Sequence, residues 1–344
     1  MNSHANSQVL VTGGTGFLGA HCVHQLLDKG YRVKTTLRSL GKKQQVIEAL
    51  KAAGITAAEK LTFMEADLSK DHNWEEATKD CDYVLHVASP LPIKMPKDEN
   101  VLIRPAVEGT LRVLEAAAKM GVKRVVMTSS FAAIGYSHKD ESKVITEADW
   151  TDPKDKSLSA YSKSKTLAEQ AAWDFIKRSD QTMELVTICP RYILGPALGQ
   201  RFTTSLTVLK NLFEGTMKAM PNVSYGIIDV RDVADLHIRA MTHPAANNQR
   251  FLASSGAPMT FKEIALLLKD KLGDKAHRVS TRVYPNWLIR MAALFDPAAK
   301  GVAPHLGKTL ISDNEKATKL LGWQPRSREA AILASIECIL KYKD

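Results

Sequence analysis

The sequence predicts an α/β protein, a doubly wound parallel sheet with a smaller C-terminal part interleaved with it. Short apolar runs rich in β-branched residues alternate with amphipathic helical windows as far as residue 190. Such alternation is typical of parallel strands that right-handed helical crossovers connect. After Pro190 the rhythm changes, because a loop over residues 190–196 is followed by longer helical windows.

The strands and helices of the first half follow from these runs in chain order. Gly30 and Gly121 end two of the helical windows, as is common at a helix C-terminus. The buried strands are expected at residues 9–12, 31–37, 61–65, 83–87, 125–128 and 185–188. The clearest helices between them are expected at residues 17–29, 111–119 and 161–178.

The C-terminal part is predicted to be mainly helical. Residues 225–229 and 232–243 again have the pattern of a strand followed by a helix, which indicates that this part is interleaved with the main sheet. The remaining helices are expected at residues 204–214, 261–272, 286–295, 314–321 and 329–342.

The composition is that of a soluble globular enzyme, with 44% hydrophobic and 24% charged residues in a chain of 344. No apolar run of about 18 residues occurs, and the first residues are polar, so neither a membrane span nor a secretory signal is expected. We therefore expect a cytoplasmic protein. The formal net charge of +10 is spread among acidic residues, without a basic run that contains aromatics, and no nucleic-acid partner is expected.

The cysteines predict no metal site and no disulfide framework. They are widely spaced and form no Cys-x-x-Cys pair, so they are expected to be reduced packing residues: Cys22, Cys81, Cys189 and Cys338.

A glycine-rich turn follows the first predicted strand and opens the first predicted helix. Gly13, Gly16 and Gly19 stand in the run Thr-Gly-Gly-Thr-Gly-Phe-Leu-Gly over residues 12–19. Glycine permits the tight turn, lets a pyrophosphate approach the backbone, and allows the helix to pack closely on the strand. The helix N-terminus adds free N–H groups and a partial positive charge. The loop therefore predicts a dinucleotide site.

The end of the second strand indicates which dinucleotide binds. An acidic residue there would bind the ribose hydroxyl of NAD, whereas a basic one would meet the additional phosphate of NADP. The strand ends at Arg38, no acid occurs in residues 31–45, and Lys42 and Lys43 follow. We therefore expect NADP(H), with a solvated helix start as the alternative interpretation of the two lysines.

Two further segments lie at carboxyl ends of predicted strands, where ligands collect in such sheets. Asp67 and Leu68 follow the third strand, and Val87, Ala88 and Ser89 follow the fourth. From this position, both segments are expected to contact the cofactor.

Tyr161 and Lys165 carry the predicted redox chemistry. A spacing of four residues places both side chains on one face of a helix, about one turn apart. The ammonium is expected to lower the phenol pKa from its usual value of about 10, so that Tyr161 exchanges a proton with a carbonyl oxygen. Ser130, after the fifth strand, would hydrogen-bond the same oxygen. An isolated Tyr-x-x-x-Lys pair occurs often by chance, so its meaning depends on the rest of the chain.

The chain resembles the extended short-chain dehydrogenase/reductase family, within it the branch of dihydroflavonol-4-reductase-like proteins and yeast-type aldehyde or methylglyoxal reductases. The resemblance extends nearly from end to end and implies a Rossmann-like fold. It is carried by residues 12–19, 67–68, 86–90, 107–110 (Val-Glu-Gly-Thr), 128–130, 161–169 (Tyr-Ser-Lys-Ser-Lys-Thr-Leu-Ala-Glu), 195–196 and 229–235.

The resemblance assigns roles to these residues. It implies that Ser130 is the catalytic serine and Tyr161 the acid/base, and that Lys165 binds the nicotinamide ribose. Phe131, Tyr192 and Ile193 would line the substrate pocket, with a core position as the alternative for each. The implied cofactor contacts are Gly13, Thr15, Gly16, Phe17, Leu18, Gly19, Arg38, Lys42, Asp67, Leu68, Val87, Ala88, Ser89, Tyr161, Lys165 and Pro190.

Three positions leave alternatives open or depart from the family. Ser129 competes for the serine role, but the stretch that follows Ser130 matches the one after the family's catalytic serine. Many members have an asparagine where this chain has Ala106, so a proton relay through that side chain is not expected. Arg191 stands where the branch has a small or apolar residue, and it would form a surface salt bridge or face an anionic or polar group of the substrate.

The sequence thus predicts an NADPH-dependent reductase of aldehydes and ketones, a monomer or homodimer. Residues 1–190 would form the NADP-binding domain, completed by about residues 225–253, and residues 191–224 and 254–344 the substrate-binding part. The alternatives are a nucleotide-sugar epimerase or dehydratase that retains NAD, a hydroxysteroid dehydrogenase, and a non-catalytic NADP sensor. Arg38 counts against the first, and the complete set of Ser130, Tyr161 and Lys165 against the last.

Overall fold

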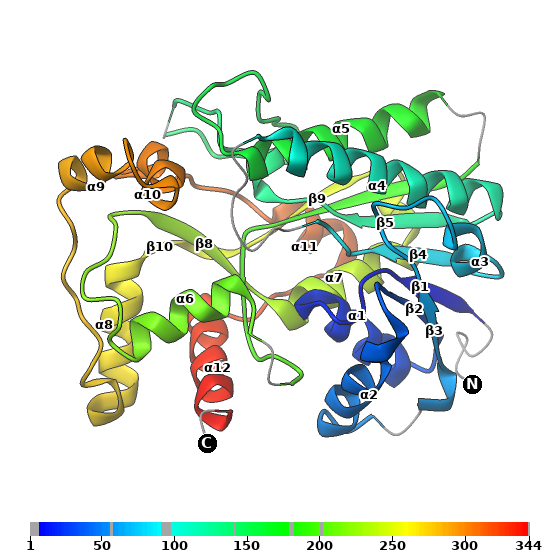
Figure 1. Ribbon diagram of the computed structural model, residues 1–344, viewed down its shortest axis with the longest axis horizontal. Helices are drawn as coiled ribbons and strands as arrows, with labels where there is room; N and C mark the ends of the chain where they lie inside the picture. The colour runs from blue at the N-terminus through cyan, green and yellow to red at the C-terminus, as the bar shows by residue number, and fades with distance from the viewer. Residues whose placement is uncertain are drawn as a thin grey trace.

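The computed structural model describes residues 7–55, 58–90, 98–140, 142–178, 182–199 and 202–342. Among these residues, seven parallel strands form the main sheet in the order β3-β2-β1-β4-β5-β6-β9 (Figure 1). The predicted doubly wound sheet is confirmed. Its strands are β1 (Gln8–Val11), β2 (Arg32–Leu37), β3 (Leu61–Glu65), β4 (Tyr83–His86), β5 (Arg124–Thr128), β6 (Glu184–Pro190) and β9 (Arg250–Ala253).

Both faces of this sheet are buried, because alternate side chains of each strand enter opposite layers. In β1, Val9 and Val11 point into one layer and Leu10 into the other. Helices cover each face, as Figure 1 shows. One layer contains α1 (Phe17–Asp28), α2 (Lys43–Ala52), α7 (Val230–Thr242) and α11 (Glu315–Leu321), and the other contains α3 (Trp74–Thr78), α4 (Asn100–Lys119) and α5 (Ala160–Arg178).

Two elements of the main domain differ from the prediction. The window at residues 111–119 is only the second half of α4, which continues through Pro105 although proline supplies no backbone N–H. Strand β9 was not predicted. It has four residues and begins at Arg250, and its pairing partner β6 is about 60 residues away in sequence, so local pattern gave no sign of it.

A second, smaller sheet lies beside the first. Within the described residues it has three strands in the order β10-β8-β7: β7 (Tyr192–Leu194), β8 (Ser224–Asp229) and β10 (Ser255–Thr260). Its core is shared with α6 (Thr204–Phe213), α8 (Phe261–Leu272) and α12 (Arg328–Lys341), while α9 (Asn286–Ala292) and α10 (Pro297–Val302) lie at its outer end (Figure 1). The chain thus leaves the main sheet at β7 and β8, returns through α7 and β9, and leaves again at β10.

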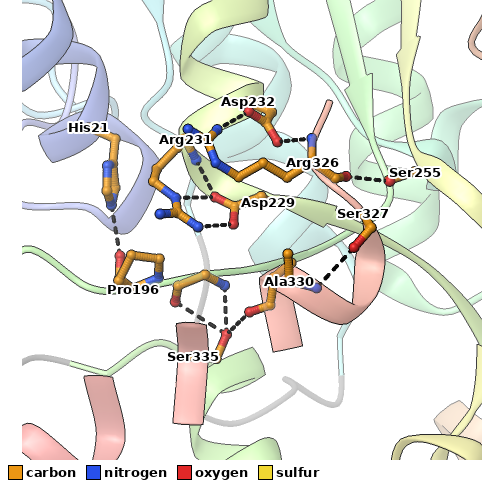
Figure 2. A network of polar contacts seen from close by, with 12 residues as sticks. His21, Pro196, Asp229, Arg231, Asp232, Ser255, Arg326, Ser327, Ala330 and Ser335 are labelled. Atoms are coloured by element: carbon orange, nitrogen blue, oxygen red, sulfur yellow. Dashed lines mark hydrogen bonds and ion pairs between the residues drawn. The ribbon is translucent and has the colours of Figure 1, made fainter. Parts of the chain in front are cut away.

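The two sheets are joined at the N-terminus of α7 (Figure 2). Asp229 ends β8 and caps α7, where its carboxylate accepts hydrogen bonds from the backbone N–H and the guanidinium of Arg231. One turn later, the Asp232 carboxylate accepts the backbone N–H of Arg326 at 2.7 Å and pairs with its guanidinium. On α12, the Ser335 hydroxyl accepts the backbone N–H of Gly195 at 2.6 Å. These bonds connect β8, the chain before α12, and the loop after β7.

In the described parts of the chain, no helix is long and apolar enough to cross a membrane. The same residues contain no cluster of histidine, cysteine and acidic side chains that could hold a metal ion. All four cysteines are buried free thiols, as the sequence analysis expected.

One buried carboxylate ties α5 to the main sheet. Glu169 of α5 is fully buried and accepts hydrogen bonds from the Ser129 hydroxyl after β5 (2.5 Å), from the Thr187 hydroxyl of β6 (2.7 Å) and from the Arg250 guanidinium of β9 (2.8 Å). Arg250 also stacks on the Trp150 ring, 3.7 Å from its centroid. The charge is therefore paired and hydrogen-bonded, which is the condition under which a buried carboxylate is stable.

We expect Glu169→Ala to lower the free energy of unfolding by about 3–5 kcal/mol, because it leaves the Arg250 guanidinium buried without its anion. Urea unfolding at equilibrium measures the change. Glu315→Ala is the matched control, since it removes a carboxylate from an exposed pair with Lys319 within one helix, and such pairs contribute little. Equal unfolding midpoints for the two variants would contradict this account of Glu169.

Candidate active site

The glycine loop is held between the ends of β1, β2 and β4. The Thr12 hydroxyl accepts the backbone N–H groups of Val87 (3.0 Å) and Ala88 (2.9 Å) and can donate to Nδ1 of His86, also at 3.0 Å. Burial lowers the pKa of His86 to about 3, so its ring is neutral and can accept this bond. On the other side, the Thr36 hydroxyl accepts the N–H of Gly13 at 3.1 Å.

Two glycines of the loop are required by space and conformation. Gly13 has φ +74°, in the left-handed region that favours glycine. A Cβ on Gly19 would lie 2.3 Å from the carbonyl oxygen of Gly13, closer than any side chain can approach. The first turn of α1 therefore packs directly on the loop.

This packing leaves donors free at the N-terminus of α1. Gly16 precedes the helix and supplies no side-chain cap. In the described part of the chain, the N–H groups of Thr15, Phe17 and Leu18 have no hydrogen-bond partner, and an open cavity of about 360 Å³ borders the loop. Unsatisfied N–H groups and the positive end of the helix dipole suit a phosphate group.

Arg38 lies exposed just beyond the end of β2, close enough to Asp67 to contribute to its lowered pKa. The main cause of that lowering is the backbone N–H of Ser69, which the Asp67 carboxylate accepts at 2.9 Å. Lys42 lies in the turn before α2. Lys43 stacks on the Phe63 ring, 5.4 Å from its centroid, so it is the less available of the two lysines.

One acid near this edge was missed by the sequence analysis. Glu65 pairs with Leu37 in the β2–β3 register, and its carboxylate accepts the backbone N–H of Leu40 at 3.2 Å. It comes from β3, so the absence of acids in residues 31–45 gave no sign of it. The register between the two strands was the missing information.

The other predicted cofactor residues lie at the carboxyl edge of the sheet. A Cβ on Gly13 would meet the Cβ of Ala88 at 3.0 Å, so the loop after β4 touches the glycine loop. Leu68 packs on Gly109 of α4, since a Cβ added to Gly109 would lie 2.8 Å from the Cβ of Leu68. Ser89 is exposed, and Pro190 ends β6 at the same edge.

Ser130 and Tyr161 meet at this edge. Ser130 follows β5, and its hydroxyl accepts the N–H of Ala132 at 3.1 Å in the short turn over Phe131–Ala133. Burial raises the pKa of the Tyr161 phenol above its usual value, and a hydrogen bond with Ser130 opposes the rise. The phenol is thus protonated at neutral pH.

The expectation that Lys165 lowers the Tyr161 pKa is wrong for this arrangement. The Lys165 ammonium donates instead to the carbonyl oxygen of Thr128, 3.3 Å away. Lys165 is itself buried, and burial lowers its pKa to about 8, although the nearby Glu169 carboxylate opposes this. The spacing of four residues was correct, but the side chain points to the end of β5.

The two candidate serines have different partners. The Ser129 hydroxyl donates to Glu169. The Ser130 side chain is on the side of Tyr161 and borders the same cavity. This geometry favours Ser130 for the catalytic role.

A cavity of about 130 Å³ opens beside Tyr161. Of the predicted pocket residues, Phe131 and Tyr192 border it, as does Pro190. Ile193 does not: successive residues of a strand point to opposite sides, and Ile193 packs against the core under the main sheet. Tyr136, Tyr225, His305 and Lys308 also border the cavity and were not predicted. The last three come from segments distant in sequence from the Tyr161 helix, whereas Tyr136 lies only five residues after Phe131.

Arg191 also borders this cavity, and the expectation of a surface salt bridge is wrong. The residue is only 8% exposed, and its guanidinium lies 3.8 Å from the centroid of the Phe131 ring. It donates to the Ser312 hydroxyl at 3.1 Å and to the Leu310 carbonyl at 3.0 Å. Burial lowers its pKa to about 10.

Comparison with known proteins identifies the family. A model of the NAD dependent epimerase/dehydratase family matches residues 9–252. The chain belongs to this family. Its members include the extended short-chain reductases that the sequence resembles, so the resemblance is confirmed.

Among curated proteins, a cinnamoyl-CoA reductase (CAD2) of Medicago truncatula is 36% identical over 78% of this chain and 82% of its own. The dihydroflavonol 4-reductase of Gerbera hybrida is 31% identical over 79% and 74%. Among solved structures, yeast methylglyoxal/isovaleraldehyde reductase Gre2 complexed with NADPH superposes with a TM-score of 0.80 at 29% identity, covering 98% of this chain and 99% of its own.

We expect Gly19→Ala to weaken NADPH binding by about tenfold or more, because the new methyl group forces α1 away from Gly13 and misplaces the free N–H groups. Isothermal titration of the protein with NADPH measures the dissociation constant. Gly301→Ala is the control, since a Cβ there meets nothing within 4 Å. Unchanged affinity in Gly19→Ala would contradict the assignment of this loop.

Proposed function

We propose that this protein is an NADPH-dependent reductase that converts aldehydes or ketones to alcohols. The observation that carries the proposal is the pairing of Ser130 with a protonated Tyr161 phenol beside one small cavity, at the carboxyl edge of the sheet that bears the glycine loop. Because the phenol is protonated at neutral pH, it can act as the general acid that gives a proton to a carbonyl oxygen. The relatives named above are reductases, which supports the proposal.

The chain fits the cofactor. The free N–H groups at the start of α1 would hold the pyrophosphate, and Arg38, with Lys42, would hold the additional phosphate of NADP. The other residues predicted to contact the cofactor, from Asp67 to Pro190 in the sequence, would line its path along the carboxyl edge of the sheet. When bound, NADPH supplies the hydride.

The side chains of the site then transfer the proton, bind the cofactor ribose and orient the substrate. Tyr161 gives its proton to the carbonyl oxygen, and Ser130 hydrogen-bonds that oxygen while negative charge develops on it. The Lys165 ammonium, anchored on the Thr128 carbonyl, binds the cofactor ribose. Phe131 and Tyr192 orient the substrate.

We also propose the division of labour that the sequence suggested. Residues 1–190, completed by about residues 225–253, hold the cofactor, and residues 191–224 and 254–344 bind substrate. In the structure β8 pairs in the second sheet and supplies the cavity residues Tyr225 and Gly226, so the part that completes the cofactor domain begins with α7, not at residue 225. A cytoplasmic location and a monomeric or homodimeric state belong to the same proposal.

A nucleotide-sugar epimerase or dehydratase is the second candidate, because the matching family model is described by that chemistry. Such an enzyme keeps its NAD through the cycle. Mass spectrometry of the small molecules released from freshly purified protein separates the two: stoichiometric NAD would favour the epimerase, and its absence the reductase.

We expect Tyr161→Phe to lower kcat/KM by about 100- to 10,000-fold, because the proton donor is lost while the ring remains. Loss of NADPH absorbance with a panel of aromatic aldehydes, diketones and ketoesters measures it. Tyr284→Phe, which removes an exposed hydroxyl outside the cavity, is the control. Undiminished turnover in Tyr161→Phe, or no turnover of any carbonyl by the unaltered protein, would overturn the proposal.

We expect Arg38→Ala to raise the KM for NADPH by on the order of tenfold and to leave that for NADH nearly unchanged, because only NADPH has the phosphate that the guanidinium would bind. Steady-state kinetics with both cofactors measure the split. Arg104→Ala, on the exposed face of α4, controls for loss of one positive charge. An equal effect on both cofactors would show that Arg38 does not contact this phosphate.

A further inference from the structure

The structure holds three buried arginines, and one of them differs from the other two. Within the described residues, these are Arg124, Arg191 and Arg250. Arg124 pairs with Glu184, and Arg250 with Glu169. Arg191 has no carboxylate within 4 Å in the part of the chain that the structure describes, and its acceptors are one hydroxyl and one backbone carbonyl.

The hydrogen-bond donors of the Arg191 guanidinium are only partly used. A guanidinium carries five N–H groups, and the bonds to Ser312 and Leu310 occupy two of them. A buried cation without an anion costs several kcal/mol in desolvation, which the Phe131 ring offsets only in part. An anion from outside the chain would complete the pair, as the glutamates do for Arg124 and Arg250.

The space around Arg191 is shaped to keep it in place. Gly226 of β8 faces the side chain, and a Cβ there would lie 2.0 Å from the Arg191 Nε. The guanidinium also lies over the Phe131 ring, 3.8 Å from its centroid. The guanidinium is thus held in one orientation, which is the condition for binding a carboxylate with little loss of conformational entropy.

The cavity beside Arg191 has a cationic and aromatic lining. Lys308 borders it together with Arg191, and no acidic side chain is among its described lining residues. His305 borders it as a neutral ring, because burial lowers its pKa. Tyr161 borders the same cavity, as does the half-buried Tyr136, whose ring packs on Phe131 with the ring centroids 5.4 Å apart. One small molecule can therefore reach the proton donor and the guanidinium together.

We propose that Arg191, with Lys308 beside it, binds the carboxylate of the substrate, so that this enzyme reduces carbonyl acids: keto acids or aldehydes that carry a carboxylate. The inference rests on the proposed reductase function and names its substrate class. In each turnover the carbonyl carbon gains a hydride from NADPH and its oxygen gains the Tyr161 proton. The carboxylate is unchanged.

The test compares each acid with its neutral ester, which removes the charge and keeps the carbon skeleton of the acid, and the change of their ratio on mutation cancels the difference in intrinsic reactivity. The pairs are pyruvate with methyl pyruvate, and para-formylbenzoate with its methyl ester. We expect the unaltered enzyme to have the higher kcat/KM for the acid of at least one pair. Arg191→Met is expected to lower the acid-to-ester ratio by on the order of 100-fold, mainly through KM, because the carboxylate loses its buried partner. Arg191→Lys is expected to recover part of it.

Arg104→Met is the matched control, since it removes an arginine from an exposed helical pair and should leave the ratio unchanged. If Arg191→Met does not fold, inhibition of ester reduction by benzoate, compared with benzamide, measures the same preference in the unaltered enzyme. Turnover of the esters with a lower kcat/KM for both acids, or an unchanged ratio in Arg191→Met, would overturn the inference and leave the reductase function intact. No turnover of any carbonyl would overturn the function itself.

Discussion

The geometry of the site depends on one buried carboxylate, that of Glu169. Its oxygens accept hydrogen bonds from three parallel strands or their ends, through Ser129, Thr187 and Arg250, and it lies on the helix that carries Tyr161 and Lys165. A buried charge tolerates little displacement, because each lost bond leaves an unsatisfied ionic group. The helix therefore has one position on the sheet, and with it the phenol has one position beside Ser130.

This constraint also separates two adjacent serines. Ser129 is used by the scaffold, and its backbone N–H donates to Ile188 at 2.7 Å, which fixes the end of β5 against β6. Ser130, one residue later, leaves the strand and opens a short turn whose first residue is Phe131. Its hydroxyl meets Tyr161 at the start of α5, whereas Ser129 meets Glu169 about two turns further along the same helix. Structural and chemical tasks thus fall to neighbouring residues.

Where sequence reasoning succeeded, the cause of the structure was local. The glycine turn, the strand before it and the helix after it lie within twenty residues, and Tyr161 and Lys165 lie within one turn. It failed where the partner was distant. The prediction of a surface salt bridge for Arg191 was wrong because its partners, Leu310 and Ser312, lie more than a hundred residues away. Likewise, Arg250 of β9 is held by Glu169, which is distant in sequence. The prediction that Lys165 lowers the phenol pKa failed for a similar reason, since the spacing of two residues along a helix does not determine the direction of a long, flexible side chain.

The residues proposed to perform the chemistry and the residues that line the rest of the cavity come from different parts of the chain. The proposed proton donor and lysine lie on α5 and the proposed serine lies in the turn after β5, all in the main domain, while most of the cavity walls come from the end of β6, from β8 and from the segment at residues 305–310. The main sheet is constrained by the cofactor loop and by the buried Glu169. The segments that form these walls also touch the main domain, where His305 lies against Tyr136 and Arg191 against Phe131. None of the described wall residues bonds to Glu169, so their side chains can differ while the helix that carries Tyr161 keeps its anchor. This arrangement explains how relatives can share one reaction and use different substrates. The main domain positions the reacting groups, and the wall segments determine which substrate fits.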